Sequence, residues 1–241
     1  MFSKLMKKII LAVVAGTLIF STATVNASAN DEVKFEDSVI VSNEVSYIEG
    51  LISVEEFQSM KLKSKSSRSA GTSGYVWGHN RFTPYYQTEF TQVNGCGPTA
   101  VANILSFYQE ARGVSLYNGE CIDQNIYNQI CADVNWSSSG TNMVNVSNGI
   151  QTFCNRAGKT CLIDSYLLNL WSDVTRDVNA GLPILVNNVT QRHFLVIFGY
   201  DNIDGQNYLY VCTGLNGNGQ QLFGYLPWGR DTLRMRSVNI Y

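Results

Sequence analysis

Cys96 lies between Gly95 and Gly97, and it is followed by Pro98 and a long apolar run. Proline suits the first turn of a helix, so this stretch predicts that Cys96 stands where a helix begins. At such a position, free backbone N–H groups and the positive end of the helix dipole favour the nucleophilic thiolate. The two glycines would let a substrate backbone approach the sulfur closely. The competing interpretation is a small apolar residue buried under a glycine-rich turn.

A nucleophilic cysteine needs a base within reach, and the chain has two histidines, His79 and His193. His193 opens the apolar run "HFLVIFGYD" directly after the polar "NNVTQR", which predicts a position at the end of a strand. His79 has no supporting pattern around it. A cysteine at a helix start, followed about a hundred residues later by a histidine on a strand, is the chain order of thiol hydrolases.

The elements that would position these two residues follow from hydrophobic periodicity and turn signals. We expect helices at the start of this region and strands after them, which is the order of an α+β domain with a C-terminal antiparallel sheet. The expected helices cover residues 98–113, 122–134, 143–156 and 167–179. The expected strands lie within 183–189, 193–201, 207–214, 221–228 and 232–241.

The N-terminus has the pattern of a signal peptide over residues 1–29. A lysine-rich start precedes the short apolar run from Ile9 to Phe20, and Ala27 and Ala29 form an A-x-A cleavage site. The apolar run is short for a membrane span. We therefore expect a secreted or envelope-associated protein with no stable membrane association after signal cleavage.

Residues 30–74 differ in composition from the rest, being polar and charged with a Lys/Ser/Gly-rich end. Within them, "ISVEEFQSMKLK" predicts a helix capped by Ser53. The region is either a flexible tail or a propeptide with a cleavable linker. The catalytic domain is then expected over residues 75–241.

Composition narrows the remaining possibilities. The chain has 241 residues, 45% of them hydrophobic and 15% charged, as expected for a globular protein. A net charge of −2 gives no indication of nucleic-acid binding. No phosphate-binding loop, zinc signature or calcium loop is present, so we expect no cofactor and no metal. Among the six cysteines, Cys121 with Cys131 and Cys154 with Cys161 are close enough in sequence to pair, but spacing alone does not decide it.

The stretches "NGCGPTAVANILSFY" and "RHFLVIFGYD" together resemble the C39-like branch of the papain-like bacterial cysteine peptidases. The resemblance covers about residues 82–227. It implies a papain-like α+β fold, with Cys96 as nucleophile on a central helix and His193 as general base and acid. It also implies that Gly199, Tyr200 and Asp201 are structural.

The family's oxyanion-binding glutamine usually lies about six residues before the cysteine, where this chain has Phe90. The resemblance therefore implies a shifted donor, for which we favour Gln92, four residues before Cys96. Asn94 and Gln87 are the alternatives. The backbone N–H of Cys96 would be the other donor.

The third catalytic residue of the family is an Asp or Asn on the next strand, which orients the histidine ring. By register this position is Thr213, which departs from the family pattern. We favour Asn216, just beyond it. Asn218 and Asn188 remain alternatives.

These residues favour an exported hydrolase that cleaves peptide bonds of peptide or protein substrates through an acyl-thioester intermediate. A second hypothesis is a cell-wall amidase or a transglutaminase-like acyl transferase with the same Cys–His chemistry. A third is a non-catalytic exported binding domain that keeps the fold, because fold alone does not fix function.

Overall fold

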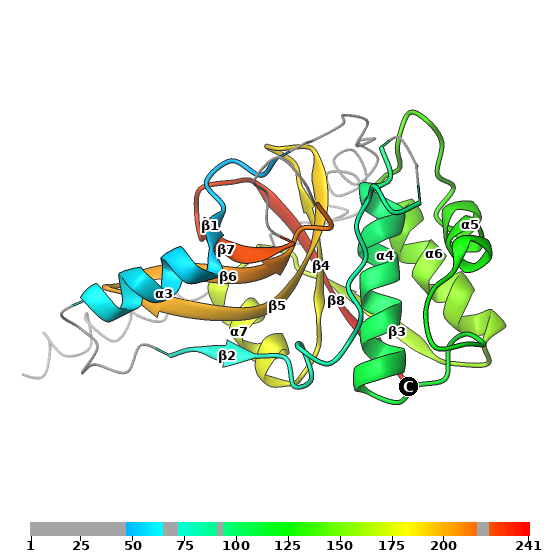
Figure 1. Ribbon diagram of the computed structural model, residues 1–241, viewed down its shortest axis with the longest axis horizontal. Coiled ribbons are helices and arrows are strands. Elements are labelled where there is room, and N and C mark those ends of the chain that lie inside the picture. The colour runs from blue at the N-terminus through cyan, green and yellow to red at the C-terminus, as the bar shows by residue number, and fades with distance from the viewer. Residues whose placement is uncertain (1–46, 65–71, 91–93, 216–221) are drawn as a thin grey trace, which may run out of the picture. The chain divides into compact units, whose positions relative to one another are not determined.

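The computed structural model describes residues 47–64, 72–90, 94–215 and 222–241, all within the unit Asp37–Tyr241 (Figure 1). The expected signal peptide, residues 1–29, lies outside these ranges. None of the helices in the described ranges has the length and apolar character needed to cross a bilayer.

The described strands form one antiparallel sheet in the order β1-β7-β6-β5-β4-β8-β3, with β2 pairing with β5 beside this path. Neighbouring strands in the C-terminal part follow each other in the chain, as expected for a meander, and β8 returns to pair with β4. The strands are β1 (Ile52–Ser53), β2 (Gly74–Tyr75), β3 (Cys161–Ser165), β4 (Ile184–Asn188), β5 (His193–Ile203), β6 (Gln206–Cys212), β7 (Phe223–Pro227) and β8 (Leu233–Ile240).

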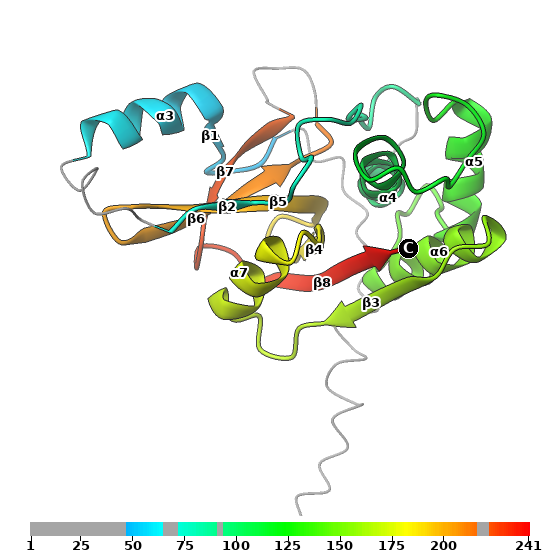
Figure 2. The ribbon, with the colours of Figure 1, turned by 90° about the horizontal axis from the view of Figure 1, so that it is seen from below.

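Three helices, α4, α5 and α6, gather beside the sheet in both views (Figures 1 and 2). Every residue of α4 is buried, and this helix contacts β5, α5 and α6. Helix α7 contacts β2, β4 and β5. The helical elements are α3 (Val54–Lys63), α4 (Cys96–Ser106), the π-helical turn η1 (Phe107–Ala111), α5 (Gln124–Asp133), α6 (Met143–Arg156) and α7 (Trp171–Asn179).

The starts of the helices around the sheet differ in how they are capped. Asp123 accepts a hydrogen bond from the backbone N–H of Ile126 at 2.8 Å, and Asn142 caps α6 in the same way at 2.8 Å. Helix α4 begins after Gly95 and has no side-chain cap. No neighbouring side chain caps the first N–H groups of α4, so they can interact with the sulfur of Cys96 at the helix start.

The N-terminal segment, residues 47–64, is part of the packed domain. Ser53 caps α3 as predicted, accepting from the backbone N–H of Glu56 at 3.0 Å. Phe57 is fully buried and stacks on Tyr225, with ring centroids 3.6 Å apart. In this structure residues 47–64 pack on the sheet, and the expected domain boundary at residue 75 stays a prediction. A propeptide role for residues 30–74 stays a prediction.

The "GYD" stretch of β5 holds this N-terminal part of the chain. A Cβ on Gly199 would lie 2.5 Å from the ring of Tyr75, so only glycine leaves room for β2. The buried carboxylate of Asp201 accepts from Lys61 Nζ at 2.7 Å and from Tyr75 Oη at 3.4 Å. These contacts agree with the structural role expected for this stretch.

Candidate active site

Cys96 is the first residue of α4 and is 3% exposed. Its sulfur receives backbone hydrogen bonds from Phe194, Gly97 and its own amide. Phe194 follows His193 directly in the chain, so the sulfur at the start of α4 contacts the beginning of β5. The two motifs predicted to carry the chemistry therefore meet at this point.

The helix start was expected to stabilise a thiolate at Cys96, but in this structure burial outweighs that effect. The three backbone hydrogen bonds lower the pKa of the thiol, but burial raises it by more, to about 11. The free-energy cost of removing a charged sulfur from water exceeds the stabilisation that the hydrogen bonds at the helix start provide. At neutral pH, Cys96 is therefore a neutral thiol.

Gly97 serves packing within the domain. A Cβ at this position would lie 2.4 Å from Thr141 Cγ2 and 3.3 Å from Val146 Cγ2. The space beside the cysteine that was expected for a substrate backbone is filled, on this side, by the residues leading into α6 and by α6 itself. Gly97 is needed because these elements approach α4 closely.

His193 opens β5 as predicted and is 1% exposed. Its Nε2 atom lies 2.7 Å from the backbone carbonyl oxygen of Thr213. A carbonyl can only accept a hydrogen bond, so Nε2 must carry the proton. This assigns the tautomer of the neutral ring and leaves the lone pair on Nδ1, the nitrogen free to act as a base.

Burial lowers the pKa of His193 to about 4, and the bond to Thr213 only partly opposes this effect. The imidazole is therefore neutral and unprotonated at Nδ1 over the whole physiological range. Nδ1 is buried and has no hydrogen-bond partner among the described residues, the sulfur of Cys96 included. Catalytic hydrogen bonds of this kind are often long in the absence of substrate and tighten when it binds.

The chain after β6 lies against the start of α4. Gly214 has a φ of +66°, and a Cβ there would lie 2.9 Å from Thr99 Cγ2, one turn into α4 from Cys96. The carbonyl of Gly214 accepts from the backbone N–H of Gln87 at 2.8 Å. The residue after Thr213, whose carbonyl contacts His193, is thus packed closely against α4.

The position expected for the third catalytic residue is filled by the main chain. Thr213 lies there by register, as the sequence indicated, but its carbonyl rather than its side chain contacts the imidazole. Asn188 is engaged elsewhere, donating to Asp231 at 2.7 Å and accepting from the backbone N–H of Gln191 at 3.0 Å. Asn216, which we favoured, and Asn218 lie outside the described residues.

Gln92, the favoured oxyanion donor, also lies outside the described residues. Phe90, at the usual position of the family's glutamine, is a core residue stacked on Tyr127 with centroids 4.0 Å apart. The side-chain nitrogen of Asn94 donates to the carbonyl of Ser138 at 2.7 Å. Gln87 lies next to Gly214, and its Oε1 atom is buried without a hydrogen-bond partner.

The other histidine and the remaining cysteines are the further groups that could do chemistry. His79 stacks on Tyr75, and burial lowers its pKa. All six cysteines are free thiols. Within the described ranges, no group of three or more His, Cys, Asp or Glu side chains could hold a metal ion.

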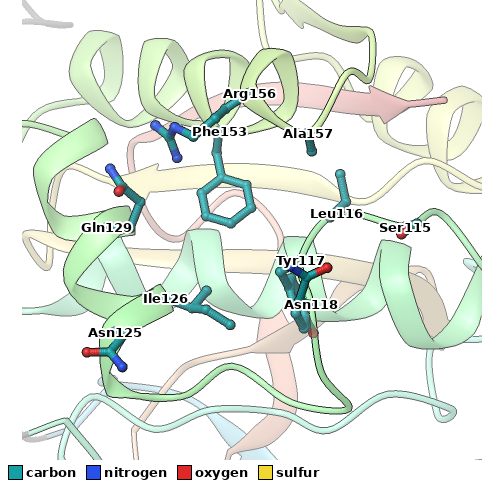
Figure 3. Close-up of a pocket in the computed structure, with 10 residues that line it drawn as sticks. All are labelled: Ser115, Leu116, Tyr117, Asn118, Asn125, Ile126, Gln129, Phe153, Arg156 and Ala157. Carbon is teal, nitrogen blue, oxygen red and sulfur yellow. The ribbon is translucent and has the colours of Figure 1, made fainter.

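A hollow of about 500 Å³ opens between α5, the end of α6 and the loop at residues 115–118 (Figure 3). Phe153 and Ile126 point into it, and Gln129 and Arg156 border it. Neither Cys96 nor His193 is among its lining residues. The hollow is therefore not the site at which this pair would meet a substrate.

A sequence model described as "Peptidase_C39 like family" matches residues 79–219, more than half of the chain. The chain belongs to this family, and the resemblance predicted from the two motifs is confirmed. A comparison with curated proteins gives no match.

Solved structures show the same fold. The structure of UfSP from C. elegans is similar with a TM-score of 0.51 and 13% identity, over 75% of this chain. The chain spans only 36% of that UfSP chain. A prointerpain A fragment from Prevotella intermedia is similar with a TM-score of 0.43 and 16% identity, over 77% of this chain and 80% of that one. The predicted fold class, helices packed on an antiparallel sheet in a papain-like arrangement, is confirmed.

Proposed function

We propose that this chain is an exported cysteine peptidase in which Cys96 attacks the peptide carbonyl and His193 moves the proton. The observation that carries the proposal is the 2.7 Å contact between His193 Nε2 and the Thr213 carbonyl. This contact leaves Nδ1 as the basic nitrogen of the ring. The next residue in the chain, Phe194, donates a backbone hydrogen bond to the Cys96 sulfur. Peptide or protein substrates are the class that the family supports.

The resting pair is a neutral thiol and a neutral imidazole, because burial raises the pKa of Cys96 and lowers that of His193. General-base catalysis follows from this charge state. As the sulfur bonds to the carbonyl carbon, Nδ1 takes the thiol proton, and the Thr213 carbonyl stabilises the resulting imidazolium. Closure of the sulfur onto Nδ1 accompanies substrate binding.

The negative charge that develops on the carbonyl oxygen needs donors close to Cys96. The backbone N–H of Cys96 is one donor, and it exchanges its contact with the sulfur for one with the oxyanion as the sulfur bonds to the carbonyl carbon. Gln92, or Gln87 beside Gly214, supplies the side-chain amide. The imidazolium then protonates the leaving amine, which leaves an acyl-thioester on Cys96. Water attacks this thioester with Nδ1 as base, and the free thiol is restored.

The test is covalent labelling by a peptidyl epoxide that alkylates papain-like enzymes, with mass spectrometry to locate the label. We expect Cys96 to be labelled in the wild type, with no labelling of Cys96→Ala. Cys131→Ala is the matched control, since Cys131 is also a buried free thiol but lies on α5 rather than at the start of α4. Casein should be cleaved under reducing conditions by the wild type and by the control only.

The same preparations separate the alternatives. Labelling of Cys96 with hydrolysis of purified peptidoglycan, and none of casein, would identify the amidase instead. Absence of both labelling and hydrolysis would identify a binding domain that keeps the fold. Export is tested separately, by finding whether the chain leaves the cell without residues 1–29.

A further inference from the structure

Two cysteines outside the candidate active site lie side by side. Cys154 is in the last turn of α6, and Cys161 is the first residue of β3. A side-chain hydrogen bond joins their sulfurs. Both residues are buried in the main core, Cys154 fully and Cys161 at 7% exposure. The proposed peptidase mechanism uses neither of them.

The connection between α6 and β3 holds this arrangement in place. Gly158, with a φ of +68°, lets the chain reverse after the helix. The backbone N–H of Lys159 then bonds back to the carbonyl of Cys154 at 2.9 Å. Thr160 and Tyr241 exchange two backbone hydrogen bonds of 3.0 Å, which continues the pairing of β3 with β8. A short turn with several backbone hydrogen bonds therefore brings Cys161 back beside the end of α6.

A third side chain places both thiols in one locality independently. The hydroxyl of Tyr108 donates to the carbonyl of Val238 at 2.5 Å, on the strand paired with β3. Tyr108 is close enough to both Cys154 and Cys161 to interact with each of them electrostatically. Tyr108, Cys154 and Cys161 thus belong to the same part of the buried core.

We propose that Cys154 and Cys161 are a vicinal dithiol that closes to a disulfide when the protein meets a small disulfide oxidant. A disulfide needs the two cysteine side chains to point toward each other at short range, and the contact between the two thiols meets this requirement. The bond would fasten the end of α6 to β3, the last strand of the sheet path. This inference does not depend on the proposed peptidase activity.

The two thiols have different roles. The interaction with Cys161, together with burial, raises the pKa of Cys154. Cys161 is the more exposed thiol and lies at an edge strand. Cys161, losing its proton to water, therefore attacks one sulfur of the oxidant and releases one thiol. Cys154 then loses its proton and attacks the Cys161 sulfur, releasing the second thiol. Two protein thiols are oxidised, and one disulfide of the oxidant is reduced to two thiols.

The experiment oxidises the purified full chain with oxidised glutathione, blocks the remaining thiols and digests the protein with trypsin. Arg156 and Lys159 lie between the two cysteines, so trypsin separates the peptide 113–156 from the peptide 160–176. We expect these two peptides to be joined after oxidation and to separate on reduction. The closed form should melt roughly 3–8 °C higher than the reduced form.

The peptide 113–156 also contains Cys121 and Cys131, so matched variants assign the bond. Cys131→Ser should keep the link, whereas Cys154→Ser and Cys161→Ser should each lose it. A link that survives in Cys154→Ser would overturn the proposal, as would glutathione adducts without any link in the wild type. Where a serine variant does not fold, fragmentation of the linked wild-type peptides by tandem mass spectrometry assigns the bond to Cys121, Cys131 or Cys154. Because Cys96 takes no part, a failed epoxide experiment leaves this result unaffected.

Discussion

At the residue scale, the central feature is a histidine oriented by the main chain. A side chain that orients a catalytic histidine can be removed by mutation, whereas the carbonyl of Thr213 is present whatever side chain the residue carries. The proton on Nε2 is donated in a hydrogen bond to this carbonyl. The ring therefore needs no carboxylate or amide side chain to fix its tautomer.

Asn216→Ala tests this arrangement, because Asn216 is the residue that the sequence favours as the orienting side chain. Where a side chain does this work, its loss lowers kcat by about 10⁴-fold. With Thr213 already holding the ring, we expect kcat for peptide cleavage to fall by less than about tenfold. A loss of about a thousandfold or more, in a variant that melts like the wild type, would assign the orienting role to Asn216.

The buried imidazole also makes stability depend on pH. Burial lowers the pKa of His193 from 6.5 to about 4. Between these two pH values, the imidazole is protonated in the unfolded chain but neutral in the folded chain. The stability that this residue contributes is complete above pH 6.5 and is lost progressively as the pH falls from 6.5 to about 4. Between pH 7 and pH 4 we expect the wild type to lose about 3 kcal/mol more unfolding free energy than His193→Gln. Urea titrations of both proteins at the two pH values measure this difference. Equal losses would show that His193 is not buried as a neutral ring.

At the element scale, α3 and β1 pack on the end of the sheet that lies away from α4. Both views place α3 at the end away from α4 (Figures 1 and 2). Asp201, which holds Lys61 of α3, lies eight residues along β5 from His193, roughly 25 Å at the usual rise of a strand. In this structure α3 therefore does not cover Cys96, and its contribution is to stability.

Phe57→Ala should lower the free energy of unfolding by about 3 kcal/mol, because it removes a fully buried ring stacked on Tyr225. Leu62→Ala is the matched control on the same helix. Leu62 is 85% exposed, and its loss should change stability by less than about 0.5 kcal/mol. Chemical denaturation of the two variants gives both values. Equal small effects would show that α3 is not docked on the sheet in solution.

The elements that periodicity and caps predict well are those that carry the candidate site. Helices α4, α5 and α6 and strand β5 lie where their apolar patterns and turn residues indicate. Strand β3 was not predicted, because it is an exposed edge strand whose partner, β8, lies about seventy residues later in the chain. Strand β2 was also missed, since its pairing depends on the room that Gly199 leaves in β5. Such long-range pairings have no local signal.

The candidate site also has some features that local sequence predicts and others that it does not. Cys96 and His193 follow from residue type and position, because a helix start and a strand start are local features. Their charge states do not, since the sequence indicates a helix dipole but not the burial that outweighs it. The Thr213 contact was also beyond prediction, because main-chain groups are the same at every residue. Sequence could indicate only that Thr213 stands where a side-chain partner was expected.

At the scale of the whole molecule, the sheet, the helical layer and the chain after β6 together exclude water from the pair. Cys96 is 3% exposed and His193 is 1% exposed, and this burial moves both pKa values away from neutrality in opposite directions. An enzyme built in this way keeps its base unprotonated far into the acid range. The fold itself, rather than any single neighbour, thus sets the pH range of the proposed reaction.

The pH dependence of kcat/KM tests this account most directly, with a peptide substrate that has no groups titrating between pH 3 and 9. The acid limb of kcat/KM reports the base in the free enzyme. We predict that activity falls with a midpoint near pH 4, the pKa of His193, and that Cys96→Ala is inactive at every pH. An acid limb near pH 6.5, the ordinary value for histidine, or activity that survives in Cys96→Ala, would contradict it.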